Sequence, residues 1–132
     1  MKKQKGFTLL ELMVVIVIIG ILLNFLIPVM VKSRYLAQLS ACEHNERNIA
    51  TALESYRTDS AGAYPETISV LTTNQNISGL PVCPVNKENY GYERSSEGQN
   101  YTMFCTAKHY LVINNVNQGF PQYTPGKGLS EK

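Results

Sequence analysis

A run of 20 residues without a charged side chain, positions 12–31, constrains this chain more than any other feature. As a single helix the run spans about 30 Å, which matches the hydrocarbon core of a bilayer. A chain of 132 residues is too small to enclose a helix that is apolar on all sides. The run therefore predicts a membrane-spanning helix.

The residues on either side of the run indicate how it would sit in the membrane. Lys2, Lys3 and Lys5 form a short basic head, and such heads stay on the cytoplasmic side. A removable secretory signal is the alternative, but it needs small residues at a cleavage site, and no alanine occurs between Phe7 and Leu36. The net charge of the whole chain, +2, is too small to indicate a nucleic-acid partner.

Glu11 is an acidic residue just inside the start of an apolar block. A carboxylate at membrane depth costs a few kcal/mol, roughly 2–4, so such residues are functional candidates. One interpretation is that Glu11 reaches back to the interface, near the helix end. The other is that it awaits a positive partner, which must come from another molecule or from a new amino terminus.

The segment from Lys5 to Glu11, KGFTLLE, resembles the class III signal of type IV pilins and of the pseudopilins of type II secretion systems. The resemblance implies that prepilin peptidase cuts between Gly6 and Phe7 and then N-methylates Phe7. It also implies that Glu11 of one subunit pairs with the terminal amine of its neighbour during assembly. Two costly charges then form one neutralised pair.

This resemblance predicts a structural protein: a subunit of a type IV pilus-like or type II secretion pseudopilus filament. It would be stored in the bacterial inner membrane, with its amino terminus cytoplasmic, and then enter a periplasmic or cell-surface filament. The implied partners are further copies of the chain, other pilin-like subunits, prepilin peptidase, and an inner-membrane platform with its ATPase. Which of the pilus, secretion and DNA-uptake machines the subunit serves stays open.

Gly20 and Pro28 lie within the apolar run. Proline removes a backbone N–H and clashes with the preceding turn, so a kink or local melting is predicted there. The resemblance implies more, since the stretch between a similarly placed Gly and Pro can lose helicity in assembled pili.

The rest of the chain predicts an α+β, pilin-like fold. No Gly or Pro occurs from Lys32 to Thr58, and apolar residues recur there at helical spacing, so one helix is predicted over about 7–58. Its second half would pack on an antiparallel sheet of about three strands: Tyr90–Arg94, Tyr101–Thr106 and Tyr110–Asn114.

Four regions follow from these predictions: a leader at 1–6, a membrane or filament-core helix at 7–31, an extracytoplasmic head at 32–114, and a flexible tail at 115–132. The tail is rich in Gly and Pro and has no period, so we predict that it is dispensable for folding. The alternative is that Phe120 and Tyr123 dock on the sheet and cover an edge strand.

Later segments extend the resemblance to about residues 1–110, in a bacterial group of prepilin-type cleavage/methylation or type II secretion proteins. They are the segments around Cys42, Tyr56, Tyr64-Pro65, Cys83-Pro84, Tyr90-Gly91-Tyr92 and Tyr101 to Cys105.

Three cysteines leave one unpaired in a compartment that permits disulfides. Cys83 precedes the predicted sheet and Cys105 ends its central strand, so we predict a Cys83–Cys105 bridge with Cys42 a buried thiol. Cys42 remains the competing partner for either of the others.

A metal site would use Cys83, Cys105 and His109, together with Cys42 or His44. The spacing Cys105-x-x-x-His109 suits metal ligands, but no paired CxxC occurs, and we predict no metal. Related major pseudopilins often bind calcium in an acid-rich late loop. Here no acid lies between Glu97 and Glu131, so a calcium site of that kind is not predicted.

The sequence contains no Gly-rich phosphate loop, no nucleophile elbow and no paired acids in a plausible pocket, so we predict no enzyme and no cofactor. The alternative to a filament subunit is a single-pass membrane protein with a small extracytoplasmic binding domain that never polymerises. Gly6-Phe7 together with Glu11 favours the filament subunit, because a plain anchor has no use for a buried acid.

Overall fold

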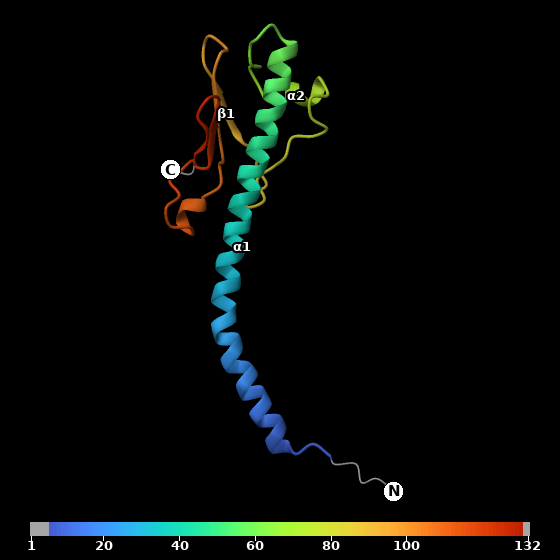
Figure 1. Ribbon diagram of the computed structural model, residues 1–132, viewed down its shortest axis with the longest axis vertical. Coiled ribbons are helices and arrows are strands. Elements are labelled where there is room, and N and C mark those ends of the chain that lie inside the picture. Colours follow the sequence, from blue (N-terminus) through green and yellow to red (C-terminus); the bar gives the residue numbers. More distant parts are fainter. Residues whose placement is uncertain (1–5, 131–132) are drawn as a thin grey trace. The chain divides into compact units, whose positions relative to one another are not determined.

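The computed structural model describes residues 6–130 (Figure 1). The chain forms two compact units, Met1–Arg34 and Tyr35–Lys132, which we call the amino-terminal unit and the head. Helix α1 (Leu9–Asp59) contributes to both, and confirms the long helix predicted over about 7–58.

In the amino-terminal unit, α1 exposes its apolar side chains in all directions. Every large apolar residue from Leu9 to Val31 is at least 44% exposed. The helix is long and apolar enough to cross a bilayer. An uninterrupted apolar surface of this size needs a cover other than water, such as lipid or other helices.

Helix α1 continues through both Gly20 and Pro28. The local melting predicted at Pro28 is therefore absent from the helix as the structure describes it. Loss of helicity between these residues remains a prediction for an assembled filament.

In the head, α1 buries one stripe of side chains at helical spacing, as predicted. The stripe consists of Leu39, Cys42, Glu46, Ile49, Ala50, Ala52 and Leu53. The helix ends where Ala61 and Gly62 adopt positive φ and the Gly62 amide donates to the Arg57 carbonyl at 3.0 Å. A short helix, α2 (Val70–Thr73), follows and buries Leu71.

Four antiparallel strands form one sheet in the order β1-β2-β3-β4. Strands β1 (Gly91–Arg94) and β2 (Tyr101–Phe104) confirm the first two predicted strands, joined by a turn in which Gly98 has a positive φ. Tyr92 lies opposite Met103 in this pair.

The other two strands, β3 (Gln122–Thr124) and β4 (Gly128–Ser130), come from the segment predicted as a flexible tail. That prediction is wrong for the described part of the segment. Tyr123 pairs with Met103 of β2 and stacks on the Tyr101 ring, while Pro121 is fully buried. Of the alternative, in which Phe120 and Tyr123 dock on the sheet, the structure shows the part that concerns Tyr123, which lies in a strand along the edge of β2.

The third predicted strand, Tyr110–Asn114, is also wrong. This segment contributes instead to the 3-10 helix η1 (His109–Leu111) and the loop after it. Strand β2 is paired on one edge with β1 and on the other with β3, so no neighbouring position is left for it. Leu111 and Val112 remain exposed as a result.

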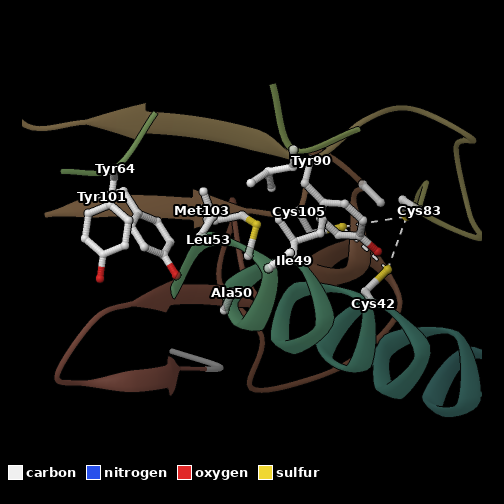
Figure 2. Packing of buried hydrophobic residues seen from close by; sticks show 13 residues of the cluster. Cys42, Ile49, Ala50, Leu53, Tyr64, Cys83, Tyr90, Tyr101, Met103 and Cys105 are labelled. Carbon is white, nitrogen blue, oxygen red and sulfur yellow. Dashed lines mark hydrogen bonds between the residues drawn. The ribbon is translucent and has the colours of Figure 1, made fainter. Parts of the chain in front are cut away.

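The core of the head lies between α1 and the sheet (Figure 2). Leu53 and Met103 occupy its middle, with the rings of Tyr64 and Tyr101 at one end. These two rings meet edge to face, with centroids 4.7 Å apart. The cysteines gather at the other end of the core.

Candidate functional site

The start of helix α1 forms a capping box between Thr8 and Glu11. The Thr8 amide and hydroxyl both donate to Glu11 Oε2 at 2.9 Å, and the Glu11 amide donates to Thr8 Oγ1 at 3.2 Å. These bonds satisfy backbone N–H groups that have no partner within the helix. Thr8 and Glu11, three residues apart, therefore fix where the helix begins.

Within residues 6–130, Glu11 has no positively charged partner. The ion pairs Arg57–Glu54 and Arg94–Glu66 both lie in the head, far along the chain from Glu11. The Glu11 carboxylate is exposed, and its capping bonds come from neutral groups. It is thus still available to a cation supplied by another molecule.

Gly6 and Phe7, the predicted cleavage site, lie just before α1 and outside regular structure. Phe7 is 81% exposed, and no atom lies within 4 Å of where a Cβ on Gly6 would be. Proteases cut most readily at exposed backbone outside regular structure, which is what these two residues present. Cleavage itself stays a prediction.

A second group of candidate residues lies in the head, where four buried side chains converge. They are Cys42, Cys83, Cys105 and His109, and their ligand atoms all lie within 4.8 Å of one another. Cys42 Sγ is 3.2 Å from Cys83 Sγ and 3.6 Å from Cys105 Sγ, and the Cys83 and Cys105 sulfurs are 3.6 Å apart (Figure 2). His109 Nε2 is 3.3 Å from Cys42 Sγ and 3.5 Å from Cys105 Sγ. We call this group the cysteine cluster.

Three different parts of the chain position the cluster. Cys42 lies on the buried stripe of α1. Cys105 directly follows β2, and its amide donates to the Pro121 carbonyl at 3.1 Å, so the strand region missed by the sequence analysis holds it in place. His109 comes four residues later, at the start of η1.

Cys83 lies in a tight turn before β1. The Lys87 amide donates to the Cys83 carbonyl at 2.9 Å, and Lys87 has a positive φ of 62°. The Val85 amide points at Cys83 Sγ, 3.4 Å away. Asn45 of α1 donates to the Val82 carbonyl at 3.2 Å, which ties this turn to the helix beside Cys42.

The predicted Cys83–Cys105 disulfide is not formed in this structure, where all three cysteines are free. Nor is Cys42 set apart from the other two, because its sulfur is the one nearest to Cys83. Cys42 is distant from the sheet in the sequence, but the packing of α1 on the sheet places its sulfur next to those of Cys83 and Cys105. His44 is exposed and does not belong to the cluster.

The surroundings of Cys42 and Cys83 favour the protonated form of these two thiols. Hydrogen bonding to Cys105 and burial together raise the pKa of Cys42 to about 12. Burial also raises the pKa of Cys83. Hydrogen bonds from the backbone amides of Asn86 and Val85 lower it, but by less. Without a cation these groups are therefore neutral thiols at physiological pH.

Glu46, which the sequence analysis did not identify as a candidate, is fully buried one turn after Cys42. Neither of its carboxyl oxygens has a hydrogen-bond partner within the described chain. Burial, with smaller contributions from Cys42 and Glu43, raises the pKa of Glu46 to about 9. The sequence does indicate its burial, because Glu46 is a charged residue between Cys42 and Ile49 on an otherwise apolar stripe of the helix.

The fold and the amino-terminal motif together define a pilin-like protein: a long helix, apolar in its first half, whose second half packs on a small antiparallel sheet. The family model of the prokaryotic N-terminal methylation motif matches residues 1–23. No solved structure matches the chain.

Several curated relatives share one name, type II secretion system core protein G. The chain is 31% identical to that of Klebsiella pneumoniae over 85% of this chain and 82% of the relative. Against that of Dickeya chrysanthemi it is 30% identical, over 82% of this chain and 72% of the relative. The chain therefore belongs to the type II secretion system core protein G family.

Similarity is higher over a shorter segment with the core protein G of Vibrio cholerae. There the chain is 37% identical over 70% of its length, and the match spans 58% of the relative.

Proposed function

We propose that this chain is a structural subunit of a type II secretion pseudopilus. Prepilin peptidase removes residues 1–6 and methylates Phe7. The apolar half of α1 holds the subunit in the inner membrane, with the amino terminus cytoplasmic and the head outside. The same helix then forms the core of the filament, and the head coats it.

The observation that carries this function is the arrangement at the start of α1. A glycine and an exposed phenylalanine precede the helix, and an acid follows at its third position, where Thr8 is its hydrogen-bond partner among residues 6–130. Cutting before Phe7 creates an ammonium group a few residues from Glu11, the cation that residues 6–130 do not supply. The match at residues 1–23 and the family membership support the same function.

The partners follow from this function. Other copies of the chain and other pseudopilins supply the terminal amine for Glu11 and cover the apolar helix. An inner-membrane platform and its ATPase supply the work of extraction from the bilayer, because a buried apolar helix leaves lipid only at a large free-energy cost. The names of the relatives favour the secretion machine over a pilus or DNA-uptake machine.

The test separates the charge of Glu11 from its role as a helix cap. Glu11→Gln removes the charge but leaves an oxygen that can still accept from Thr8, since Gln also serves in capping boxes. Thr8→Ala breaks the box and keeps the charge. Glu97→Gln, in the exposed β1–β2 turn, controls for the loss of one acid elsewhere.

Filaments sheared from cells expressing each variant are quantified against the membrane-inserted pool. We expect Glu11→Gln to insert normally and form almost no filament, Thr8→Ala to form filaments in reduced amount, and Glu97→Gln to match the unmodified chain. Normal filaments from Glu11→Gln would contradict the assembly role. A chain that inserts and never polymerises in its own host would instead support the single-pass binding protein.

A further inference from the structure

We propose that the cysteine cluster binds one zinc ion, with Cys42, Cys83, Cys105 and His109 as its four ligands. The site is structural, joins α1 to the sheet and to the turn before β1, and is independent of the proposed function.

The donor set is the first argument. Three cysteines and one histidine make up one of the usual ligand sets of structural zinc, and sulfur with imidazole nitrogen selects zinc over magnesium or calcium. The spacing Cys105-x-x-x-His109 places two ligands on one short segment, as in other zinc sites. A disulfide, in contrast, would use two sulfurs and leave the third with no partner of its kind.

The distances are the second argument. Zinc–sulfur bonds of about 2.3 Å and zinc–nitrogen bonds of about 2.0 Å in a tetrahedron require S···S separations of about 3.8 Å and S···N separations of about 3.5 Å. The three S···S separations here are 3.2, 3.6 and 3.6 Å, and His109 Nε2 lies 3.3 Å from Cys42 Sγ and 3.5 Å from Cys105 Sγ. Every pair of the four ligand atoms lies within 4.8 Å. The four atoms thus already stand close to the corners of a zinc tetrahedron.

The enclosure of the cluster is the third argument. Cys42 and Cys105 are 0% exposed, Cys83 is 1% exposed and His109 is 5% exposed. Structural zinc sites are closed in this way and leave no open position for substrate. The Val85 amide aimed at Cys83 Sγ is the kind of outer hydrogen bond that supports a metal-bound thiolate.

Binding balances as an exchange of protons for metal. Three thiols release three protons, three thiolates and the neutral imidazole of His109 take up one Zn²⁺, and the centre carries a net charge of −1. No oxidant or reductant is required. In an oxidising compartment, the bound thiolates would also be protected from disulfide exchange.

The test uses the full chain purified from membranes in detergent, without added chelator or reductant, after alkylation of free thiols. We expect about one zinc per chain by elemental mass spectrometry and no alkylation of the three cysteines until a chelator is added. Replacement of zinc by Co²⁺ should give sulfur-to-cobalt charge-transfer absorption together with the visible bands of tetrahedral cobalt.

Variants show which residues hold the metal. Cys42→Ser and Cys105→Ser should each lose the zinc. His109→Cys should keep it and strengthen the charge-transfer absorption of the cobalt form, so it reports on the site even if the serine variants fail to fold. His44→Gln, an exposed histidine on the same helix as Cys42, is the matched control and should keep a full zinc.

Two results would overturn the site. One is a chain without zinc whose peptide map shows a disulfide between Cys83 and Cys105, or between Cys42 and either of them. The other is zinc that stays at the same level in both serine variants, because such zinc is bound elsewhere on the protein.

Discussion

The amino-terminal unit and the head solve the problem of burying apolar side chains in opposite ways. In the described part of the amino-terminal unit, the hydrogen bonds join residues three or four positions apart, and the apolar side chains from Leu9 to Val31 stay exposed. In the head, residues distant in sequence, such as Cys42, Cys83 and Cys105, meet in one buried core. The head therefore buries its apolar core within itself, whereas the amino-terminal unit leaves its apolar surface for other molecules to cover, as the proposed function requires.

The largest expected effect concerns the amino-terminal unit. Gly6→Leu should block processing, and with it assembly, because a bulky side chain next to the cut obstructs the protease. Gly20→Ala, where an added Cβ meets no atom within 4 Å, is the control and should be processed normally. Immunoblots of membrane fractions separate precursor from mature chain. Normal processing of Gly6→Leu would remove Gly6 from the recognised motif.

The second effect concerns the head and its carboxyl-terminal strands. A chain ending at Asn115 loses the buried Val116 and Pro121 and the paired Tyr123, so we expect a loss of stability on the order of 5 kcal/mol. The truncated chain also lacks the Pro121 carbonyl, which accepts the hydrogen bond from the Cys105 amide. All eight tyrosines lie in the head, so near-ultraviolet circular dichroism follows its unfolding in the full chain.

The control for this truncation is Lys127→Ala, in the exposed turn between β3 and β4, which should melt like the unmodified chain. Equal melting temperatures for the truncated and full chains would restore the prediction of a dispensable tail.

A smaller effect, dependent on pH, is expected at Glu46. Its native pKa of about 9 exceeds its unfolded value of 4.5, so the native state holds a proton that the unfolded state releases. Stability from this group is therefore fully present below pH 4.5 and falls as pH rises toward 9. Glu46→Gln removes this dependence, so its stability relative to the unmodified chain should rise by about 4 kcal/mol from pH 5 to pH 8.

Urea unfolding of both chains at the two pH values measures that gain. The quantity compared is the difference in free energy of unfolding between the two chains. Zinc binding also depends on pH, but it changes the stability of both chains alike. If the difference is the same at pH 5 and pH 8, Glu46 is not a buried neutral acid.

The smallest effect concerns one hydrogen bond. The Tyr92 hydroxyl donates to the Pro65 carbonyl at 2.7 Å and ties the loop after α1 to β1. Tyr92→Phe should cost about 1 kcal/mol, visible as a small drop in the melting temperature of the head and no change in processing. A change in filament yield without a change in melting temperature would place Tyr92 at a contact between subunits.

The contrast between the two units also explains which elements the sequence could predict: those that depend on neighbouring residues and not those that depend on long-range packing. The span of α1 and the motif at Glu11 follow from local patterns, and β1 and β2 from runs of strand-forming residues. Strands β3 and β4 could not be predicted from local patterns, because Pro121, Gly126 and Gly128 indicate a loop. A strand forms there only through long-range pairing, such as that of Tyr123 with Met103.

The candidate site divides in the same way. The spacing of Cys105 and His109 was visible in the sequence, but Cys42 joins them only through the packing of α1 on the sheet. Polar Glu46 on an apolar stripe was visible too, but its burial depends on the same packing.

The central claim, that the amino-terminal unit is processed for assembly while the head folds by itself, is tested most directly by the intact mass of the protein purified from its own host. We predict a chain that begins at Phe7 and carries one added methyl group on its amino terminus. A chain that begins at Met1, or after Val31, would contradict the account.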